Sequence, residues 1–364
     1  MARTSVPTPE LAGPAASGRR LAGLDVARAV ALVGVVTMNW TARFNDFAFQ
    51  ANGVGEGPDW LERVLHVYDG PLSTRFAAAL VTIAGVGVSL MAARGDGADT
   101  GWRLRRRGFL LFAAGYAFEW VWGGQILSFY GAFLLLGSFL LTVPTRWLVA
   151  AAAAAGAASG LVAMTWYQTD TGAHDWMWLL EVDPDSPRNL LFDTAVNGTH
   201  PLIPWLAFFL TGMAVGRLDL GAPATRRRLV ALGVLLVVVG YAASSLLTRA
   251  SSGAWSFVTG LGLAPYRPLY VVAAVGTSLV AIGLLTGVRF PLLARAGQMT
   301  LSLYLLHAFL ANVLIDWLHV EDVGLVASLA LALAYWTAAV LVASAWRARI
   351  DLGPAERLYR RFGG

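Results

Sequence analysis

The sequence lacks two residue types that carry much of protein chemistry. Its 364 residues include no cysteine and no lysine, so all 27 basic side chains are arginines. Without cysteine, disulfide bonds, thiolate metal sites and cysteine nucleophiles are excluded. Without lysine, Schiff-base catalysis is excluded as well.

Charged residues of every kind are scarce. They make up 13% of the chain, about half the share in an ordinary soluble domain, where about 25% of residues are charged. Hydrophobic residues make up 57%, and the mean hydropathy is +0.60. This composition predicts an all-α, polytopic integral membrane protein whose partner is the lipid bilayer. The net charge of +5 comes from arginines in loops and does not indicate a nucleic-acid partner. No His, Asp or Glu group has metal-ligand spacing, so no metal is expected.

Ten apolar segments are each long enough to cross a bilayer core of about 30 Å. They lie at residues 24–42, 75–93, 107–122, 126–143, 147–166, 201–217, 229–248, 268–288, 298–318 and 324–346. We therefore predict about ten transmembrane helices within one membrane domain, residues 21–350. Residues 1–20 are rich in small residues and proline and predict a disordered cytoplasmic tail, and residues 351–364 form a basic cytoplasmic tail.

The arginines are distributed unequally between the two sides. With the N-terminus in the cytoplasm, that side collects the arginines of 103–107, 226–228 and 347–361, while most acidic residues fall on the opposite side. Arginine-rich loops remain cytoplasmic. We therefore expect cytoplasmic N- and C-termini and a multi-pass protein of the cell (plasma or inner) membrane. The two long outer loops are 43–74 and 167–200.

The segment between the first two spans contains a histidine beside an acid. Residues 58–71 predict a short amphipathic helix at the membrane surface. His66 and Asp69 are three residues apart, so the carboxylate is placed to orient the imidazole. The alternative is a solvated histidine on an interfacial loop helix.

Several polar side chains fall inside or beside spans, where their cost makes each a functional candidate. Asp25 and Arg28 are spaced to pair at the start of the first span, in either a structural or a functional role. His307, in the middle of a span, predicts a hydrogen bond between helices. The remaining candidates are Asn39 near the outer end of the first span, Glu119 among tryptophans, Trp176 in the second outer loop, and His200 at the outer mouth of the sixth span.

Four segments, in this order, resemble transmembrane acyltransferases related to heparan-alpha-glucosaminide N-acetyltransferase. They are Arg20 to Arg28 with Asp25 (followed by Asn39), His66-Val-Tyr-Asp-Gly70, His200-Pro-Leu-Ile-Pro-Trp to Arg217, and Gly297 to His307. The chain departs from the family pattern in three places: Ala29 replaces a glycine, the His66 segment is one residue shorter and lacks the family's tryptophan, and the spacing from Asn39 to His66 is longer.

The resemblance implies an enzyme that moves an acetyl or other short acyl group from cytosolic acyl-CoA, its cosubstrate, to an amine or hydroxyl of an extracytoplasmic carbohydrate or glycolipid. It implies His66 as general base or acyl-accepting nucleophile, Asp69 as its orienting group and Asn39 as an oxyanion donor. The expected donor-binding residues are Asp25, Arg28, Arg105, Arg106 and Arg107, and the expected acceptor-binding residues are His200, Glu119 and Trp176. Topology alone also explains the run of arginines.

Two other functions agree with the same residues. In a transporter or exporter of a small or lipid-linked molecule, Asp25, Arg28 and His307 serve gating or proton coupling. In an inactive family member, the bundle serves as a membrane scaffold. Binding of acyl-CoA separates the enzyme from the transporter. Acceptor, acyl length and formation of a homo-oligomer stay open.

Overall fold

A computed structural model of the chain describes residues 21–45, 59–66, 70–95, 97–180, 187–263 and 266–364. Within these residues the regular structure is helical, apart from one isolated β-bridge between Leu263 and Tyr266. The all-α prediction is confirmed. The tail predicted at residues 1–20 lies outside the described residues.

The helices follow one another through the whole described chain. The long ones are α1 (Ala22–Arg43), α3 (Arg75–Ala92), α4 (Gly97–Phe118), α5 (Leu127–Gly137), α6 (Thr145–Asp170), α9 (Leu202–Val215), α10 (Pro223–Ala250), α12 (Pro268–Leu285), α14 (Thr300–Asn312) and α15 (Leu325–Arg347). The short ones are α2 (Asp59–Leu65), α7 (Met177–Leu180), α8 (Pro187–Phe192), η2 (Asp193–Asn197), α11 (Gly253–Thr259), α13 (Pro291–Gly297), η3 (Val313–Trp317) and α16 (Pro354–Gly363).

Each of the ten predicted spans has a helix, but not all are built to cross a membrane. In the described part of the chain, seven helices are long and apolar enough, and a pair bent by 63°, Leu190–Asn197 with Leu202–Val215, makes a possible eighth. The helix α4 begins at Gly97, ten residues before the expected span, and carries arginines in its first half, while α5 has only 11 residues. Length and composition therefore support a polytopic bundle of seven or eight spans and leave the prediction of ten unconfirmed.

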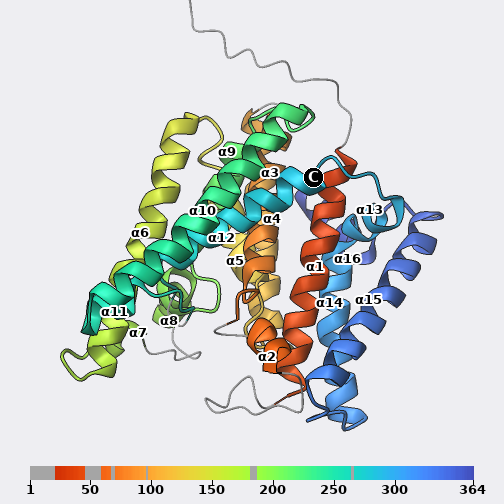
Figure 1. The fold of residues 1–364 in the computed structure, drawn as a ribbon. Helices are drawn as coiled ribbons and strands as arrows, with labels where there is room; N and C mark the ends of the chain where they lie inside the picture. Colours follow the sequence, from red (N-terminus) through yellow and green to blue (C-terminus); the bar gives the residue numbers. More distant parts are fainter. Residues whose placement is uncertain (1–20, 46–58, 67–69, 96, 181–186, 264–265) are drawn as a thin grey trace, which may run out of the picture.

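The bundle has two distinct ends. Figure 1 shows that α1 begins at the end where the chain terminates, whereas α2 and α11 lie at the opposite end. At the first end, Arg107 in α4 donates to the carbonyl oxygen of Gly364 at 3.1 Å, and Arg347 in α15 donates to Gln298 at 2.6 Å. We call this the arginine-rich end. The opposite end, with α2 and α11, is called the pocket end below.

Close helix crossings depend on glycine. Between α3 and α9, a methyl group on Gly212 would lie 1.9 Å from the carbonyl oxygen of Thr82, and one on Gly85 would lie 2.1 Å from that of Phe209. Between α4 and α5, a methyl group on Gly115 would lie 2.2 Å from the amide nitrogen of Ser128. Small residues let membrane helices approach this closely. The first of these crossings holds α3 against α9, and both helices border the cavity at the pocket end.

Candidate active site

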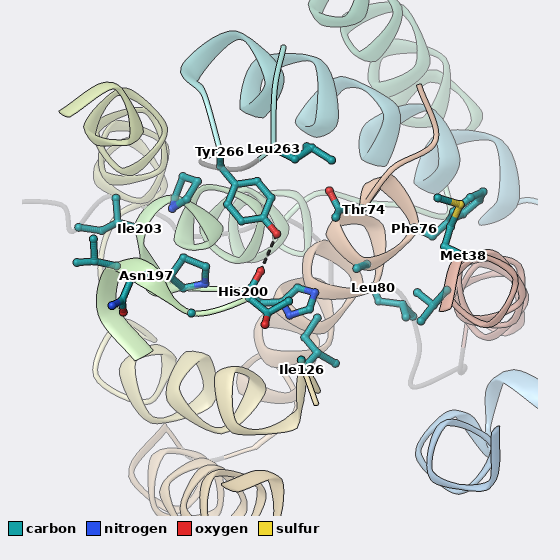
Figure 2. A pocket seen from close by; sticks show the side chains of 18 of the residues that line it. Met38, Thr74, Phe76, Leu80, Ile126, Asn197, His200, Ile203, Leu263 and Tyr266 are labelled. Atoms are coloured by element: carbon teal, nitrogen blue, oxygen red, sulfur yellow. Dashed lines mark hydrogen bonds between the residues drawn. The ribbon is translucent and has the colours of Figure 1, made fainter. Parts of the chain in front are cut away.

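The pocket end contains a cavity of about 440 Å³ (Figure 2). Its wall is formed by α1, α3, the last turns of α6, the connection into α9, and single residues from other elements. The lining residues include the polar and aromatic Asn39, Thr74, Trp166, Asn197, His200, Tyr266 and Tyr304, the backbone of Gly124, and the apolar Val35, Met38, Phe76 and Leu80. The cavity thus joins residues that lie more than 260 positions apart.

The connection into α9 forms one side of the cavity because the bent pair changes direction there. The last turn of η2 stops at Asn197, and Pro201 in extended conformation precedes α9. Tyr266 donates its hydroxyl to the carbonyl oxygen of Thr199 at 2.6 Å, the bond drawn in Figure 2. This bond connects the turn between η2 and α9 to the segment before α12. It thereby holds His200, the residue after Thr199, against the cavity.

His200 is 9% exposed and is enclosed by aromatic rings. Its ring centroid lies 4.5 Å from that of Trp205 and 5.8 Å from that of Phe129, both in edge geometry. Among the residues that the structure describes, its buried Nδ1 has no hydrogen-bond partner. A buried polar atom without a partner costs free energy, so this nitrogen is suited to a ligand group in the cavity.

Asn39 is held by the buried His307. The Asn39 Nδ2 and His307 Nε2 atoms are 3.0 Å apart, and His307 Nδ1 contacts the carbonyl oxygen of Tyr304. Because the amide nitrogen is a donor, Nε2 accepts and Nδ1 donates, which sets the tautomer. Trp122 lies over the same imidazole, with 5.3 Å between ring centroids. The hydrogen bond between helices predicted for His307 is confirmed, and Asn39 keeps a second N–H for the cavity.

His66 follows the last residue of α2, is partly exposed, and is not among the cavity-lining residues. The helix that precedes it lies beside the cavity wall. Leu61 and Leu65 of α2 pack against Met38 and Phe76, which both line the cavity. Asp69, predicted to orient His66, lies outside the described residues.

The other two expected acceptor-binding residues differ in position. Glu119 accepts the amide of Gly124, a lining residue, at 2.7 Å, so it supports the rim of the cavity. Trp176 donates to Gln168 at 2.7 Å and contacts His174, with ring centroids 4.5 Å apart, away from the lining. The tryptophan that lines the cavity is Trp166.

At the arginine-rich end, Asp25 and Arg28 form the predicted ion pair at 2.8 Å. The other oxygen of Asp25 accepts the Gln298 amide at 3.1 Å, and Gln298 in turn accepts from Arg347 at 2.6 Å. The Asp25 side chain is 2% exposed, whereas that of Arg28 is 31% exposed. The network therefore buries its carboxylate and leaves the Arg28 side chain partly exposed.

Of the three arginines at 105–107, only Arg107 lies close to the Asp25–Arg28 network. Arg107 lies over the Tyr359 ring at 5.2 Å. Burial raises the pKa of the Tyr359 hydroxyl, while the charges of Arg107 and Arg28 oppose that rise, which places both guanidinium groups near this tyrosine. Arg105 instead lies 5.6 Å from the rings of Trp102 and of Phe139, and Arg106 is exposed.

The two regions are stacked along α1. Val35, the cavity residue nearest to Arg28 in sequence, is seven residues further on, which is about 10 Å along a helix. Tyr130 of α5 lies within electrostatic range of both Arg28 and Tyr304.

Sequence reasoning missed Tyr130, Tyr304 and Gln298, because uncharged residues in apolar helices give no local signal. Tyr304 and Gln298 nevertheless fall in the fourth segment that resembles the family. Among the described residues, no group of three or more His, Asp or Glu side chains forms a metal site.

Comparison with known proteins gives two family matches. Residues 20–240 match the model described as heparan-alpha-glucosaminide N-acetyltransferase, catalytic. Residues 218–363 match a family described as protein of unknown function, DUF418. No curated protein matches the chain. The first match contains α1, α3, α9 and most of the cavity, whereas Tyr266, Gln298, Tyr304 and His307 fall in the second.

Proposed function

Because the chain belongs to the heparan-alpha-glucosaminide N-acetyltransferase family, we propose that it transfers an acetyl or other short acyl group from acyl-CoA to an amine or hydroxyl of a carbohydrate acceptor. Membership makes it a membrane acetyltransferase; the donor, the acceptor and the residue roles are the proposal. One observation carries it: a cavity that contains Asn39 and His200 is stacked along α1 with the Asp25–Arg28 pair.

The donor binds at the arginine-rich end. Coenzyme A carries several phosphate charges and does not cross a bilayer, so its nucleotide remains on one side. Arg28 retains N–H groups beyond the one given to Asp25, and Arg107 lies near the same tyrosine, so both are placed to bind phosphate. Asp25, Gln298 and Arg347 set the position of Arg28. The acyl end then passes Tyr130 to reach the cavity.

The acceptor binds in the cavity. The unpartnered Nδ1 of His200 hydrogen-bonds an acceptor hydroxyl or amine, and Trp166 offers an aromatic face to a sugar ring. An imidazole enclosed by Phe129 and Trp205 is costly to charge. We therefore assign acceptor binding to His200 and leave the proton transfer to a histidine with access to water.

His66 is that histidine in our proposal. It is partly exposed and follows the helix that packs on the cavity wall. As general base, it removes a proton from the acceptor as the nucleophile attacks the thioester carbonyl, and the thiolate of coenzyme A leaves and takes up a proton. The second route passes through an acyl-imidazole on His66. In both routes the free N–H of Asn39 donates to the developing oxyanion.

Reconstituted liposomes test the function. Acetyl-CoA labelled in the acetyl group is added outside, and glucosamine is enclosed inside. Because acetyl-CoA does not cross the bilayer, labelled N-acetylglucosamine inside requires transfer through the protein. We expect this product with the wild-type chain and its loss with His66→Ala.

Binding of acetyl-CoA to the purified chain separates enzyme from transporter. An acetyltransferase binds acetyl-CoA and consumes it slowly even without acceptor, because water replaces the acceptor. A chain that neither binds nor consumes acetyl-CoA would refute the proposal. Uptake of glucosamine without acetylation would instead favour transport.

A further inference from the structure

A second, smaller cavity of about 120 Å³ lies beside the first at the pocket end, and Leu263 lines both. Its other lining residues come from the segment before α3, from α10, from the segment before α12 and from α12 itself. They are Gly70, Pro71, Arg75, Tyr241, Leu261 and Tyr270. The cavity is therefore a polar recess that contains one arginine and two tyrosine hydroxyls, next to the proposed acceptor cavity.

Arg75 is the unusual member of this group. It is 7% exposed, and its guanidinium lies 4.6 Å from the Tyr270 ring and 5.8 Å from the Tyr241 ring. Nη2 makes one long hydrogen bond, 3.5 Å to the Tyr241 hydroxyl. Its Nε and Nη1 are buried without a hydrogen-bond partner, and no described acidic side chain forms an ion pair with it.

This arrangement is costly unless something binds there. A buried guanidinium needs hydrogen-bond partners or a counterion, and the aromatic faces supply only part of that stabilisation. Arg75 is also the first residue of α3, and a helix N-terminus favours negative charge rather than positive. Desolvation and helix dipole therefore both favour an anion in this recess.

We infer that Arg75, with Tyr241 and Tyr270, forms a subsite for an oxyanion (carboxylate, sulfate or phosphate) carried by the acceptor whose reacting amine or hydroxyl occupies the neighbouring cavity. This inference rests on the proposed function, because it assigns a class of acceptor to it. Arg75 binds the anion by charge-assisted hydrogen bonds from Nε and Nη1, and the Tyr241 hydroxyl, which accepts from Nη2, donates a neutral one. The Tyr270 hydroxyl is bonded to Thr74, so Tyr270 contributes its ring face. The subsite selects acidic sugars over neutral ones and takes no part in the chemistry.

The first experiment is a binding measurement that does not depend on turnover. The thermal unfolding temperature of the purified wild-type chain is measured in sodium sulfate and in sodium chloride at equal ionic strength. We expect a higher unfolding temperature in sulfate for the wild type and for Arg249→Gln, an exposed arginine of α10 that serves as matched control. For Arg75→Gln we expect a smaller rise from chloride to sulfate, because only the general stabilisation by an excluded kosmotropic anion then remains. An equal rise in the wild type and in Arg75→Gln overturns the subsite.

The second experiment compares two acceptors, glucosamine and glucosamine 6-sulfate. We expect the KM for the sulfated sugar to be about 10- to 100-fold lower in the wild type and in Arg249→Gln, as for a hydrogen bond to a charged group. In Arg75→Gln, the KM values for the two sugars should become nearly equal. Should Arg75→Gln not fold, competition on the wild type replaces it: sulfate must inhibit transfer to glucosamine 6-sulfate more strongly than transfer to glucosamine.

The outcomes separate this inference from the proposed function. Sulfate binding that depends on Arg75 without acetyl transfer refutes the function, whereas acetyl transfer without preference for the sulfated sugar refutes the subsite. A lipid phosphate is the other source of an oxyanion. Nanodiscs of phosphatidylcholine and of phosphatidylglycerol test this second source. The assignment to the acceptor is overturned if phosphatidylglycerol stabilises the wild type but not Arg75→Gln and the enzyme shows no preference between the two sugars.

Discussion

Arg28 and Arg75 lie at opposite ends of the bundle and have opposite surroundings. Arg28 is partly exposed and paired with Asp25, whose other oxygen is held by Gln298. Arg75 is more deeply buried, and within the described part of the chain two of its guanidinium nitrogens have no hydrogen-bond partner. An arginine is therefore held by a hydrogen-bond network at one end of the bundle, whereas at the other end no described acidic side chain neutralises it. A buried cation's role is therefore read from its partners, not from its presence in the sequence.

The arginine-rich end and the pocket end differ in the same way. The arginine-rich end contains a connected network suited to hold a polyanionic donor, and the pocket end contains cavities with unpartnered polar atoms suited to receive an acceptor. If this division is correct, substitutions at the pocket end lower kcat or change acceptor KM, and substitutions at the arginine-rich end change the KM for acetyl-CoA.

The largest effect is expected from His66→Ala. Removal of a general base lowers kcat by about 10²- to 10⁴-fold, and the KM for acetyl-CoA should not change, because His66 lies at the end opposite the donor. Initial rates over a range of acetyl-CoA concentrations measure both constants. His319→Ala, an exposed histidine, is the control. If a folded His66→Ala protein keeps the wild-type kcat, another residue is the general base. A loss of kcat in His200→Ala would then identify His200 as that residue.

A somewhat smaller loss is expected from Asn39→Ala. Loss of one oxyanion donor lowers kcat by about 10²- to 10³-fold. Because His307 holds Asn39 at 3.0 Å, the two act as one unit. The double variant with His307→Ala should therefore be no slower than the worse of the single variants. If the losses in kcat multiply instead, His307 has a role independent of Asn39.

Arg28→Gln should affect the donor. The KM for acetyl-CoA should rise about tenfold or more, as for loss of a hydrogen bond to a charged group, while kcat at saturation changes little. Steady-state rates with varied acetyl-CoA and fixed glucosamine measure this split. Arg295→Gln serves as control, since Arg295 donates to the carbonyl oxygen of Ser344, outside the Asp25 network. A fall in kcat with unchanged KM would place Arg28 in the chemistry and break the division between the ends.

The smallest effect is expected from Arg106→Gln. This side chain is exposed, unlike its half-buried neighbours Arg105 and Arg107, and exposed charges contribute little to binding or stability. Both kinetic constants should remain within about twofold of wild type. Arg107→Gln tests the contrast, because this residue contacts Tyr359 and Gly364 and should raise the KM for acetyl-CoA. Equal effects of the two substitutions would mean that the run acts only through its total charge.

Sequence reasoning predicted the class of fold and the local pairs. Apolar segments predicted the helices, since a membrane-spanning backbone must satisfy its hydrogen bonds within the segment. The spacing of Asp25 and Arg28 predicted their ion pair, because residues three apart share a helix face. The same reasoning placed α4 ten residues late, since it followed hydropathy where the helix continues through charged residues. It also counted the segment of α5 as a span, whereas the helix there has 11 residues.

The composition and periodicity of the sequence by themselves determined an all-α membrane bundle, and its ordered motifs determined the family to which it belongs. Only the tertiary structure decided which polar groups meet. It brought Asn39 to His307, set His200 rather than Trp176 in the cavity wall, and left Arg75 buried without a counterion among the described residues. The physical reason is range. Helix formation and membrane insertion depend on neighbouring residues, whereas a binding site depends on contacts between segments that lie far apart in the chain, which local patterns do not specify.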